Sequence, residues 1–196
     1  MHPLIKNYKL ILGSKSPRRV QLLQESGFDF EVFTTDVEEE FHEEMPGVEV
    51  PTYLAKVKAD AIFATRKFSD DEILLTADSV VILDNVIYGK PMDAQDARAM
   101  LSKLSGKQHT VITGCCLKNN SKELCFQGVS EVKMADLDEN EINYYIEKYQ
   151  PFDKAGSYAV QEWIGLCKIS SIEGTYSNIM GLPTFQLFEH LKTFII

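Results

Sequence analysis

An apolar run of eleven residues, Ile73–Leu83, constrains the fold more than any other part of the chain. Its continuous apolar character and its β-branched residues predict a strand buried on both faces, as at the centre of a sheet. The dipeptide Asp84-Asn85 then predicts a tight turn into a short strand at 86–88. The chain is therefore predicted to fold around a sheet in which this run is a central strand.

The rest of the chain alternates predicted strands and helices. Strands are predicted at 8–13, 30–34, 109–118 and 123–134, with a glycine-containing strand region at 156–172. Helices are predicted from Pro17 to Gly27, at 51–68, from Asp93 to Gly106, at 138–149 and from Pro183 to about 193. A turn at 119–121 joins 109–118 and 123–134 into a hairpin. This order predicts an α/β fold with a mixed central β-sheet flanked by helices.

Length and charge limit what such a fold can do. The 196 residues suffice for one substantial domain or for two small lobes that share a core. The formal charge of −9 argues against a nucleic-acid polymer as a partner, because phosphate backbones attract a broad face of Lys and Arg. A small anionic ligand remains compatible, since the local charge of a site can oppose the global sign.

The cysteines and the N-terminal residues indicate a cytoplasmic protein. The four cysteines include an adjacent pair, Cys115 and Cys116, but no CxxC pair, which argues against zinc and for reduced, mostly buried thiols. The four histidines, at 2, 42, 109 and 190, lack metal spacing. Residues 1–10 lack the apolar stretch of a signal peptide, and nothing approaches the roughly 18 continuous apolar residues of a membrane span.

The loop after the first predicted strand carries the clearest chemical signal. A strand–loop–helix unit directs backbone N–H groups at the helix N-terminus, where anions bind. Ser14 and Ser16 add hydroxyl donors, and Arg18 and Arg19 add guanidinium groups that match phosphate oxygens. Two arginines at this end oppose the helix dipole, a cost that a bound polyanion would offset. An ordinary Ser-Pro helix start with two solvated arginines is the alternative.

Other charged residues have a functional and a structural interpretation. Asp78 lies inside the apolar run, where a carboxylate is costly unless it is paired or functional, so we interpret it as a base or a metal ligand. Lys90 lies in the Gly89-Lys90-Pro91 turn and could bring a cation to the same place. Spacing alone makes Lys58 a solvated lysine. Glu38, Glu39 and Glu40 form an exposed acidic run unless one or two of them hold Mg²⁺.

Gln161 and its neighbours are less informative taken alone. Its amide offers one acceptor and two donors, which suits a base edge that mixes both. On composition alone a polar strand residue at the surface is the simpler interpretation. The chain lacks GxGxxG, GxxxxGK[ST], HExxH and GxSxG motifs, which disfavours the commonest nucleotide-binding and hydrolase classes.

Seven short motifs nevertheless occur in one order, and together the chain resembles the Maf family of nucleoside triphosphate pyrophosphatases. They are Ser14–Arg19, Leu54–Ala59, Ala77–Val81, Gly89–Pro91, Asp153–Gly156, Tyr158–Gln161 and Gly181–Pro183. Each is weak alone, but their order across nearly the whole chain is specific. The resemblance implies a single Maf-like domain over 1–196, two-lobed, with an active-site cleft between the lobes.

The same resemblance implies a reaction and a set of roles. A nucleoside triphosphate would be cleaved between its α- and β-phosphates with a divalent cation, Mg²⁺ or Mn²⁺. By matching position Asp78 would accept the proton of water. Together with Glu38 and Glu39 of the acidic run, Asp78 is also a candidate ligand of the metal. The residues implied to bind phosphates are Ser14, Ser16, Arg18, Arg19, Lys58 and Lys90; Arg18, Ser79 and Gln161 match positions that distinguish substrate subgroups. A homodimer fits the resemblance.

The stretch Tyr158–Gln161 is similar to the branch of the family that acts on dTTP and UTP. Two departures from that branch affect the base pocket. Ser79 stands where threonine is usual, and Glu162-Trp163 replaces a glycine-rich continuation. The alternatives left open are a pyrophosphatase for 7-methyl-GTP or another purine triphosphate, and a nucleotide-binding regulator of cell division.

Overall fold

The computed structural model describes residues 3–196, so Met1 and His2, which entered the sequence arguments above, lie outside the described residues. The chain divides into two compact units. The first comprises the residues up to Asp78, together with Thr113–Gly128 and Gly181–Ile196; the second comprises Ser79–Ile112 and Val129–Met180. Three long strands supply residues to both units: β3 (Glu72–Leu83), β5 (Gln108–Lys118) and β6 (Glu123–Met134).

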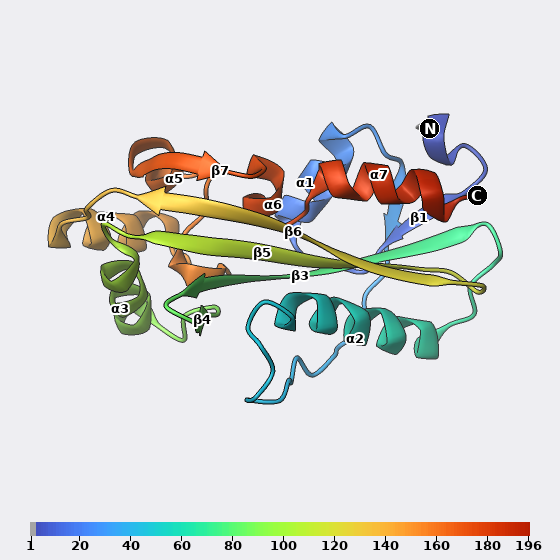
Figure 1. Ribbon diagram of the computed structural model, residues 1–196, viewed down its shortest axis with the longest axis horizontal. Coiled ribbons are helices and arrows are strands. Elements are labelled where there is room, and N and C mark those ends of the chain that lie inside the picture. The colour runs from blue at the N-terminus through green and yellow to red at the C-terminus, as the bar shows by residue number, and fades with distance from the viewer. Residues whose placement is uncertain (1–2) are drawn as a thin grey trace. The chain divides into compact units, whose positions relative to one another are not determined.

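The first unit is a sheet covered on both faces. Its further elements are η1 (Pro3–Ile5), β1 (Lys9–Leu12), α1 (Pro17–Glu25), β2 (Phe30–Val32), α2 (Val50–Thr65) and α7 (Thr184–Phe194). The strand order is β2-β1-β3-β5-β6, and β1 runs parallel to both of its neighbours. Helix α2 covers one face, and α1 and α7 cover the other (Figure 1). One apolar cluster under α2 contains Ile11, Ala55, Ala59, Ile62, Phe68, Leu74 and Cys116.

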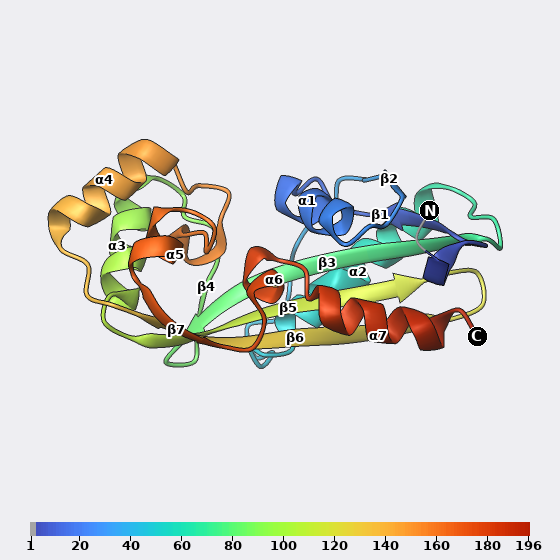
Figure 2. The same ribbon diagram turned by 90° about the horizontal axis from the view of Figure 1, so that it is seen from above.

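The second unit adds β4 (Val86–Tyr88), α3 (Ala94–Leu104), α4 (Glu139–Tyr149), η2 (Ala155–Ser157), α5 (Trp163–Cys167), β7 (Ile169–Glu173) and α6 (Tyr176–Met180). Strand β4 pairs antiparallel with β3, and β7 pairs antiparallel with β6. Helices α3, α4 and α5 gather beside one another (Figure 2). Their apolar faces meet in a core that includes Leu101, Tyr145 and Ile164.

The predicted mixed sheet flanked by helices is confirmed, and so are most local signals. Asp93 caps α3 by accepting from the backbone N–H of Asp96 at 2.8 Å, and Asp138 forms a capping box with Glu141. Ser16 does occupy the N-cap of α1, but its side chain makes no capping hydrogen bond.

The predicted strand region at 156–172 is wrong. Gly156 and Ser157 have φ of 67° and 61°, a left-handed conformation that interrupts an extended chain. Residues 163–167 then form α5, and only 169–173 form a strand. The segment is apolar because it packs against the core of the second unit. Apolar composition alone does not distinguish such a buried segment from a buried strand.

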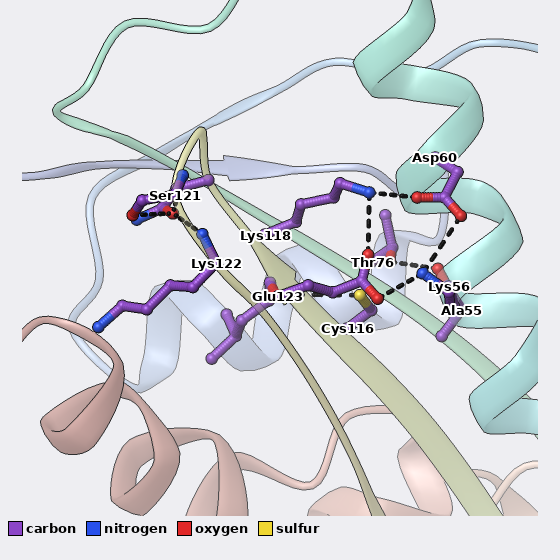
Figure 3. Close-up of polar contacts among 11 residues, drawn as sticks. Ala55, Lys56, Asp60, Thr76, Cys116, Lys118, Ser121, Lys122 and Glu123 are labelled. Carbon is purple, nitrogen blue, oxygen red and sulfur yellow. Dashed lines mark hydrogen bonds and ion pairs between the residues drawn. The ribbon is translucent and has the colours of Figure 1, made fainter.

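Glycine at 114 allows α2 to approach the sheet closely. A Cβ at Gly114 would lie 2.2 Å from the backbone nitrogen of Thr52, so only glycine leaves room for the start of this helix. Buried Thr76 on β3 donates its hydroxyl to the carbonyl oxygen of Ala55 at 2.6 Å, which ties the helix to the strand (Figure 3). Together these contacts fix which residues of α2 face β3.

The predicted free thiols are present, although only two of them are buried. Cys115 and Cys116 are buried, whereas Cys125 is half-buried and Cys167 is exposed. Within residues 3–196, no helix is both long enough and apolar enough to cross a membrane.

Candidate active site

The parallel register of β1 and β3 determines which residues come together in the first unit. Leu12 pairs with Leu75, and the N–H of Gly13 donates to the carbonyl oxygen of Leu75 at 2.8 Å. The chain leaves β1 there, whereas β3 continues through Asp78 to Leu83. Ligands of α/β sheets bind beyond the carboxyl ends of parallel strands, so this is the expected place for a site.

Ser14 and Arg19 are joined directly in the loop after β1. The Ser14 hydroxyl oxygen is buried and accepts from the backbone N–H of Ser16 at 3.2 Å and from Nη1 of Arg19 at 3.1 Å. Nε of Arg19 donates to the carbonyl oxygen of Gly181 at 2.7 Å. The guanidinium group is therefore held at two points, one of them in a segment more than 160 residues away in the sequence.

The environment of Arg19 is that of a desolvated cation near an anion. Burial lowers the pKa of Arg19 below its ordinary value, and the negative charge of Asp78 opposes that shift. Arg18 occupies the same first turn of α1 with a half-buried side chain. The loop thus presents a fixed arginine, a second arginine beside it and a buried hydroxyl group.

Lys58 on α2 contacts two carboxylates. Its ammonium group is 2.6 Å from Oδ1 of Asp78 and 2.9 Å from Oε1 of Glu39. The side chains of Lys58 and Asp78 are only 15% and 12% exposed, so this pair is largely removed from water. The solvated lysine expected from spacing alone is therefore wrong, because α2 turns Lys58 toward the sheet.

The predicted metal ligands are only partly brought together. Asp78 and Glu39 contact the same ammonium group, so two carboxylates face one cationic point; Glu38 and Glu39 are both exposed. Among residues 3–196, no group of three metal-ligating side chains includes these carboxylates. Two carboxylates that converge on a cation fit a hard divalent ion, which takes its remaining ligands from water and substrate phosphates.

The predicted residues of the second unit lie on separate segments. Ser79 is half-buried on β3, and Lys90 is exposed in the turn after β4. The carbonyl oxygen of Gly89 accepts from the N–H of Gly156 at 3.0 Å, and Gly156 packs against Val81. The motif at 89–91 is thereby joined to the motif at 153–156.

Gln161 is half-buried rather than displayed on a surface strand. Its Oε1 is buried and has no hydrogen-bond partner among the described residues. A buried amide oxygen without a partner is costly, because it has lost water and gained nothing in exchange. A ligand that donates a hydrogen bond would remove that cost.

Lys154 and Glu162 belong to the same segment, and sequence reasoning did not select them as site residues. Lys154 is 8% exposed and lies 2.7 Å from a carboxylate oxygen of Asp153 and 3.5 Å from one of Glu162. The Tyr145 hydroxyl contacts Glu162 and accepts from the N–H of Ala159 at 3.0 Å. This network orders the chain on both sides of Gln161. The only sequence signal for Lys154 was its position in the motif Asp153–Gly156.

The geometry is that of an α/β protein with a candidate anion site at the carboxyl end of β1. The chain belongs to the Maf family: the model of the Maf-like protein matches residues 9–194.

Individual relatives agree over nearly the full length. The chain is 46% identical over 189 residues to the dTTP/UTP pyrophosphatase of Bacteroides fragilis, covering 96% of this chain and 97% of the relative. It is 44% identical over 191 residues to the protein of that name from Porphyromonas gingivalis, covering 97% and 96%. Among solved structures, the chain is similar to the Staphylococcus aureus Ham1 protein, with a TM-score of 0.48 and 15% sequence identity. The match covers 65% of this chain and 72% of the Ham1 chain, and we base no argument on so slight a likeness.

Proposed function

We propose that this chain is a nucleoside triphosphate pyrophosphatase that hydrolyses dTTP and UTP to the monophosphate and pyrophosphate. Membership of the Maf family and full-length relatives named dTTP/UTP pyrophosphatase support the reaction. The structural observation that carries the proposal is the buried contact between Lys58 and Asp78, in the unit that also holds the arginine-bearing start of α1.

Asp78 is the proposed proton acceptor for the attacking water. Its carboxylate contacts the ammonium group of Lys58 at 2.6 Å. Phosphate oxygens are strong acceptors for an ammonium group, so a bound triphosphate competes for Lys58. Asp78 then keeps its position on β3 and becomes available to take the proton while the bond between the α- and β-phosphates breaks.

The cationic and hydroxyl groups act on the charge of the substrate and of the leaving pyrophosphate. We assign phosphate binding to Ser14, Ser16, Arg18, Arg19, Lys58 and Lys90. Arg19 is already oriented by its contacts to Ser14 and Gly181, so little reorganisation is needed when charge develops. The bound anion lies beside the two arginines and offsets their unfavourable interaction with the dipole of α1.

We propose a divalent cation, Mg²⁺ or Mn²⁺, as the cofactor. Asp78 and Glu39 would hold it, and exposed Glu38 lies close enough in sequence to contribute through water. Such an ion neutralises phosphate charge and lowers the pKa of bound water.

Base recognition is assigned to Gln161 and Ser79, together with Arg18. The unpartnered Oε1 of Gln161 would accept the ring N–H that uracil and thymine both carry, and its amide N–H₂ would donate to a neighbouring carbonyl oxygen of the base. We also propose that the chain acts in the cytoplasm as a homodimer and as a single domain.

A product analysis tests the reaction. The purified chain is incubated with dTTP, UTP, CTP, ATP, GTP and 7-methyl-GTP, each with Mg²⁺, with Mn²⁺ and with a chelator, and the products are separated. We expect monophosphate and pyrophosphate from dTTP and UTP, and loss of turnover with the chelator. Release of orthophosphate, or turnover of no nucleotide, would overturn the proposal. Preference for 7-methyl-GTP would favour the purine alternative.

A further inference from the structure

The β5–β6 hairpin places two cysteines opposite each other. The backbone N–H of Asn119 donates to the carbonyl oxygen of Lys122 at 3.0 Å, which closes a two-residue turn. Residues at equal distances before Asn119 and after Lys122 therefore face each other along the hairpin. Cys116 lies three residues before Asn119 and Cys125 lies three residues after Lys122, so the two cysteines face each other.

Contacts on either side of the cysteines support this register. Near the turn, Lys118 lies 2.9 Å from a carboxylate oxygen of Glu123. Farther along, the hydroxyl of Thr110 donates to Glu131 at 2.8 Å. Both contacts join residues that are directly opposite in the register set by the turn. Directly opposite side chains on one face of an antiparallel pair have their Cβ atoms about 4.5–5.5 Å apart.

Glu123 brings a carboxylate to the same two thiols. The sulfur atoms of Cys116 and Cys125 and a carboxylate oxygen of Glu123 all lie within 4.8 Å of one another. The thiol of Cys116 donates to the backbone carbonyl oxygen of Leu117 at 3.9 Å. Three potential ligand atoms thus converge without any movement of the backbone.

Two lysines orient the carboxylate from its other side. Nζ of Lys56 contacts one oxygen of Glu123, and Nζ of Lys118 contacts the other; both lysines also contact Asp60 on α2 (Figure 3). Each carboxylate oxygen retains lone-pair capacity, and ligating carboxylates are commonly held by such outer contacts. The two ammonium groups also offset the negative charge that two thiolates would add.

The donor set selects the kind of ion. Two sulfur ligands and one oxygen suit a thiophilic ion such as Zn²⁺ and do not suit Mg²⁺, which requires oxygen ligands. Three protein ligands leave a fourth tetrahedral position for water.

We propose that Cys116, Cys125 and Glu123 form a Zn²⁺ site that fastens the end of the β5–β6 hairpin. Binding forms two Zn–S bonds and one Zn–O bond, and the two thiol protons are released to solvent. The site shares no residue with the candidate active site. The sequence argued against zinc because no CxxC pair exists, but the hairpin register supplies the pair across two strands.

The test uses the full chain, stripped of metal with a chelator, kept reduced and titrated with Zn²⁺ or Co²⁺ alone. We expect one Zn²⁺ per chain bound at the thiols, and a near-ultraviolet thiolate-to-Co²⁺ charge-transfer band on replacement by Co²⁺. That band separates this site from metal held by Asp78 and Glu39, because oxygen ligands do not produce it. Absence of stoichiometric Zn²⁺ binding, or binding without the thiolate band, would overturn the proposal.

Variants assign the ligands. Cys125→Ser and Cys116→Ser should abolish the charge-transfer band, and Glu123→Gln should retain a weaker band with Zn²⁺ affinity reduced by about tenfold or more. Cys115→Ser, one position along the same strand, and Cys167→Ser, at an exposed cysteine, should behave like the wild type. Equal binding by Cys125→Ser and the wild type would contradict the assignment.

Chemical protection gives a readout on the wild-type chain that does not depend on variant folding. Alkylation of each cysteine is followed by peptide mass spectrometry with and without Zn²⁺. We expect Zn²⁺ to slow the alkylation of half-buried Cys125 by about tenfold or more, in proportion to the occupied fraction, and to leave that of exposed Cys167 unchanged. Equal rates at Cys125 in both conditions would overturn the site.

Discussion

The two units treat their buried polar groups differently. In the first unit, charged groups are paired with one another: Lys58 contacts Asp78 and Glu39, and Arg66 contacts Glu72 at 3.0 Å. In the second, most buried polar groups are neutral. The exception is the buried ammonium group of Lys154, which lies near the carboxylates of Asp153 and Glu162.

His109 and Gln161 represent the neutral groups of the second unit. Nε2 of His109 lies 2.7 Å from the hydroxyl of Tyr158, and burial lowers the pKa of His109 to about 4. Gln161 keeps a buried amide oxygen without a partner among the described residues. Paired charges suit a triphosphate and a proton transfer, whereas neutral donors and acceptors suit a pyrimidine base. The comparison therefore predicts that variants of the first unit affect phosphate binding or turnover and that Gln161 variants affect base selectivity.

The largest effect is expected for Asp78→Asn. The amide keeps the size of the carboxylate but cannot accept the proton of water, so we expect kcat to fall by about 10²–10⁴-fold. Pyrophosphate release from dTTP and UTP measures it. The matched control is Asp71→Asn, at a half-exposed surface carboxylate that is paired with Lys9, and it should leave kcat unchanged. Wild-type turnover by Asp78→Asn would exclude it as the base.

The neutrality of His109 predicts how stability depends on pH. The unfolded chain binds a proton at His109 near pH 6.5, whereas the folded chain binds it only near pH 4. Stability from this group is therefore present above pH 6.5 and is lost as the pH falls toward 4. The loss is on the order of 3 kcal/mol in the free energy of unfolding.

Urea unfolding between pH 4 and 7 measures this loss. His109→Gln, which cannot titrate, should flatten the pH dependence, and His42→Gln at an exposed histidine should not. A pH profile for His109→Gln as steep as that of the wild type would mean that His109 titrates alike in both states.

Arg19→Lys tests whether the first unit needs a directed cation or only a charge. Lysine replaces the planar guanidinium group, which contacts Ser14 and Gly181 through two separate nitrogens, by a single ammonium group, so we expect KM for dTTP to rise by about tenfold, with a smaller change in kcat. Steady-state kinetics measures both constants. Arg98→Lys, at an exposed arginine of the second unit that contacts Asn143, is the control and should leave KM as it is. An unchanged KM in Arg19→Lys would mean that charge alone suffices.

The smallest effect is expected for Gln161→Ala. We expect the ratio of kcat/KM for dTTP to that for GTP to fall by about three- to tenfold, through loss of discrimination rather than of turnover. Gln186→Ala removes another glutamine, on α7, whose buried Oε1 has no partner among residues 3–196, and it should leave the ratio unchanged. Equal loss of turnover with every nucleotide would mean that Gln161 does not contact the base.

Local sequence signals predicted most of the fold. The run 73–83 is a central strand, Asp93 caps a helix, and residues 119–122 form the hairpin turn. The segment 156–172 was mispredicted, because left-handed backbone at Gly156 and Ser157 outweighed its apolar composition. Helix α6 was not predicted, since its turn-rich sequence gives no helical periodicity.

The sequence by itself determined the chemical groups available: a carboxylate in an apolar strand, two arginines at a helix start and four thiols without a zinc motif. Only the tertiary structure decided which of them meet. Lys58 reaches Asp78 because Gly114 and Thr76 hold α2 against the sheet, and Arg19 is fixed by Gly181 from the other end of the chain. Cys116 meets Cys125 because the hairpin register aligns them. Spacing along the chain records local periodicity, whereas these contacts depend on strand register and helix packing, which bring distant residues within a few ångströms of one another.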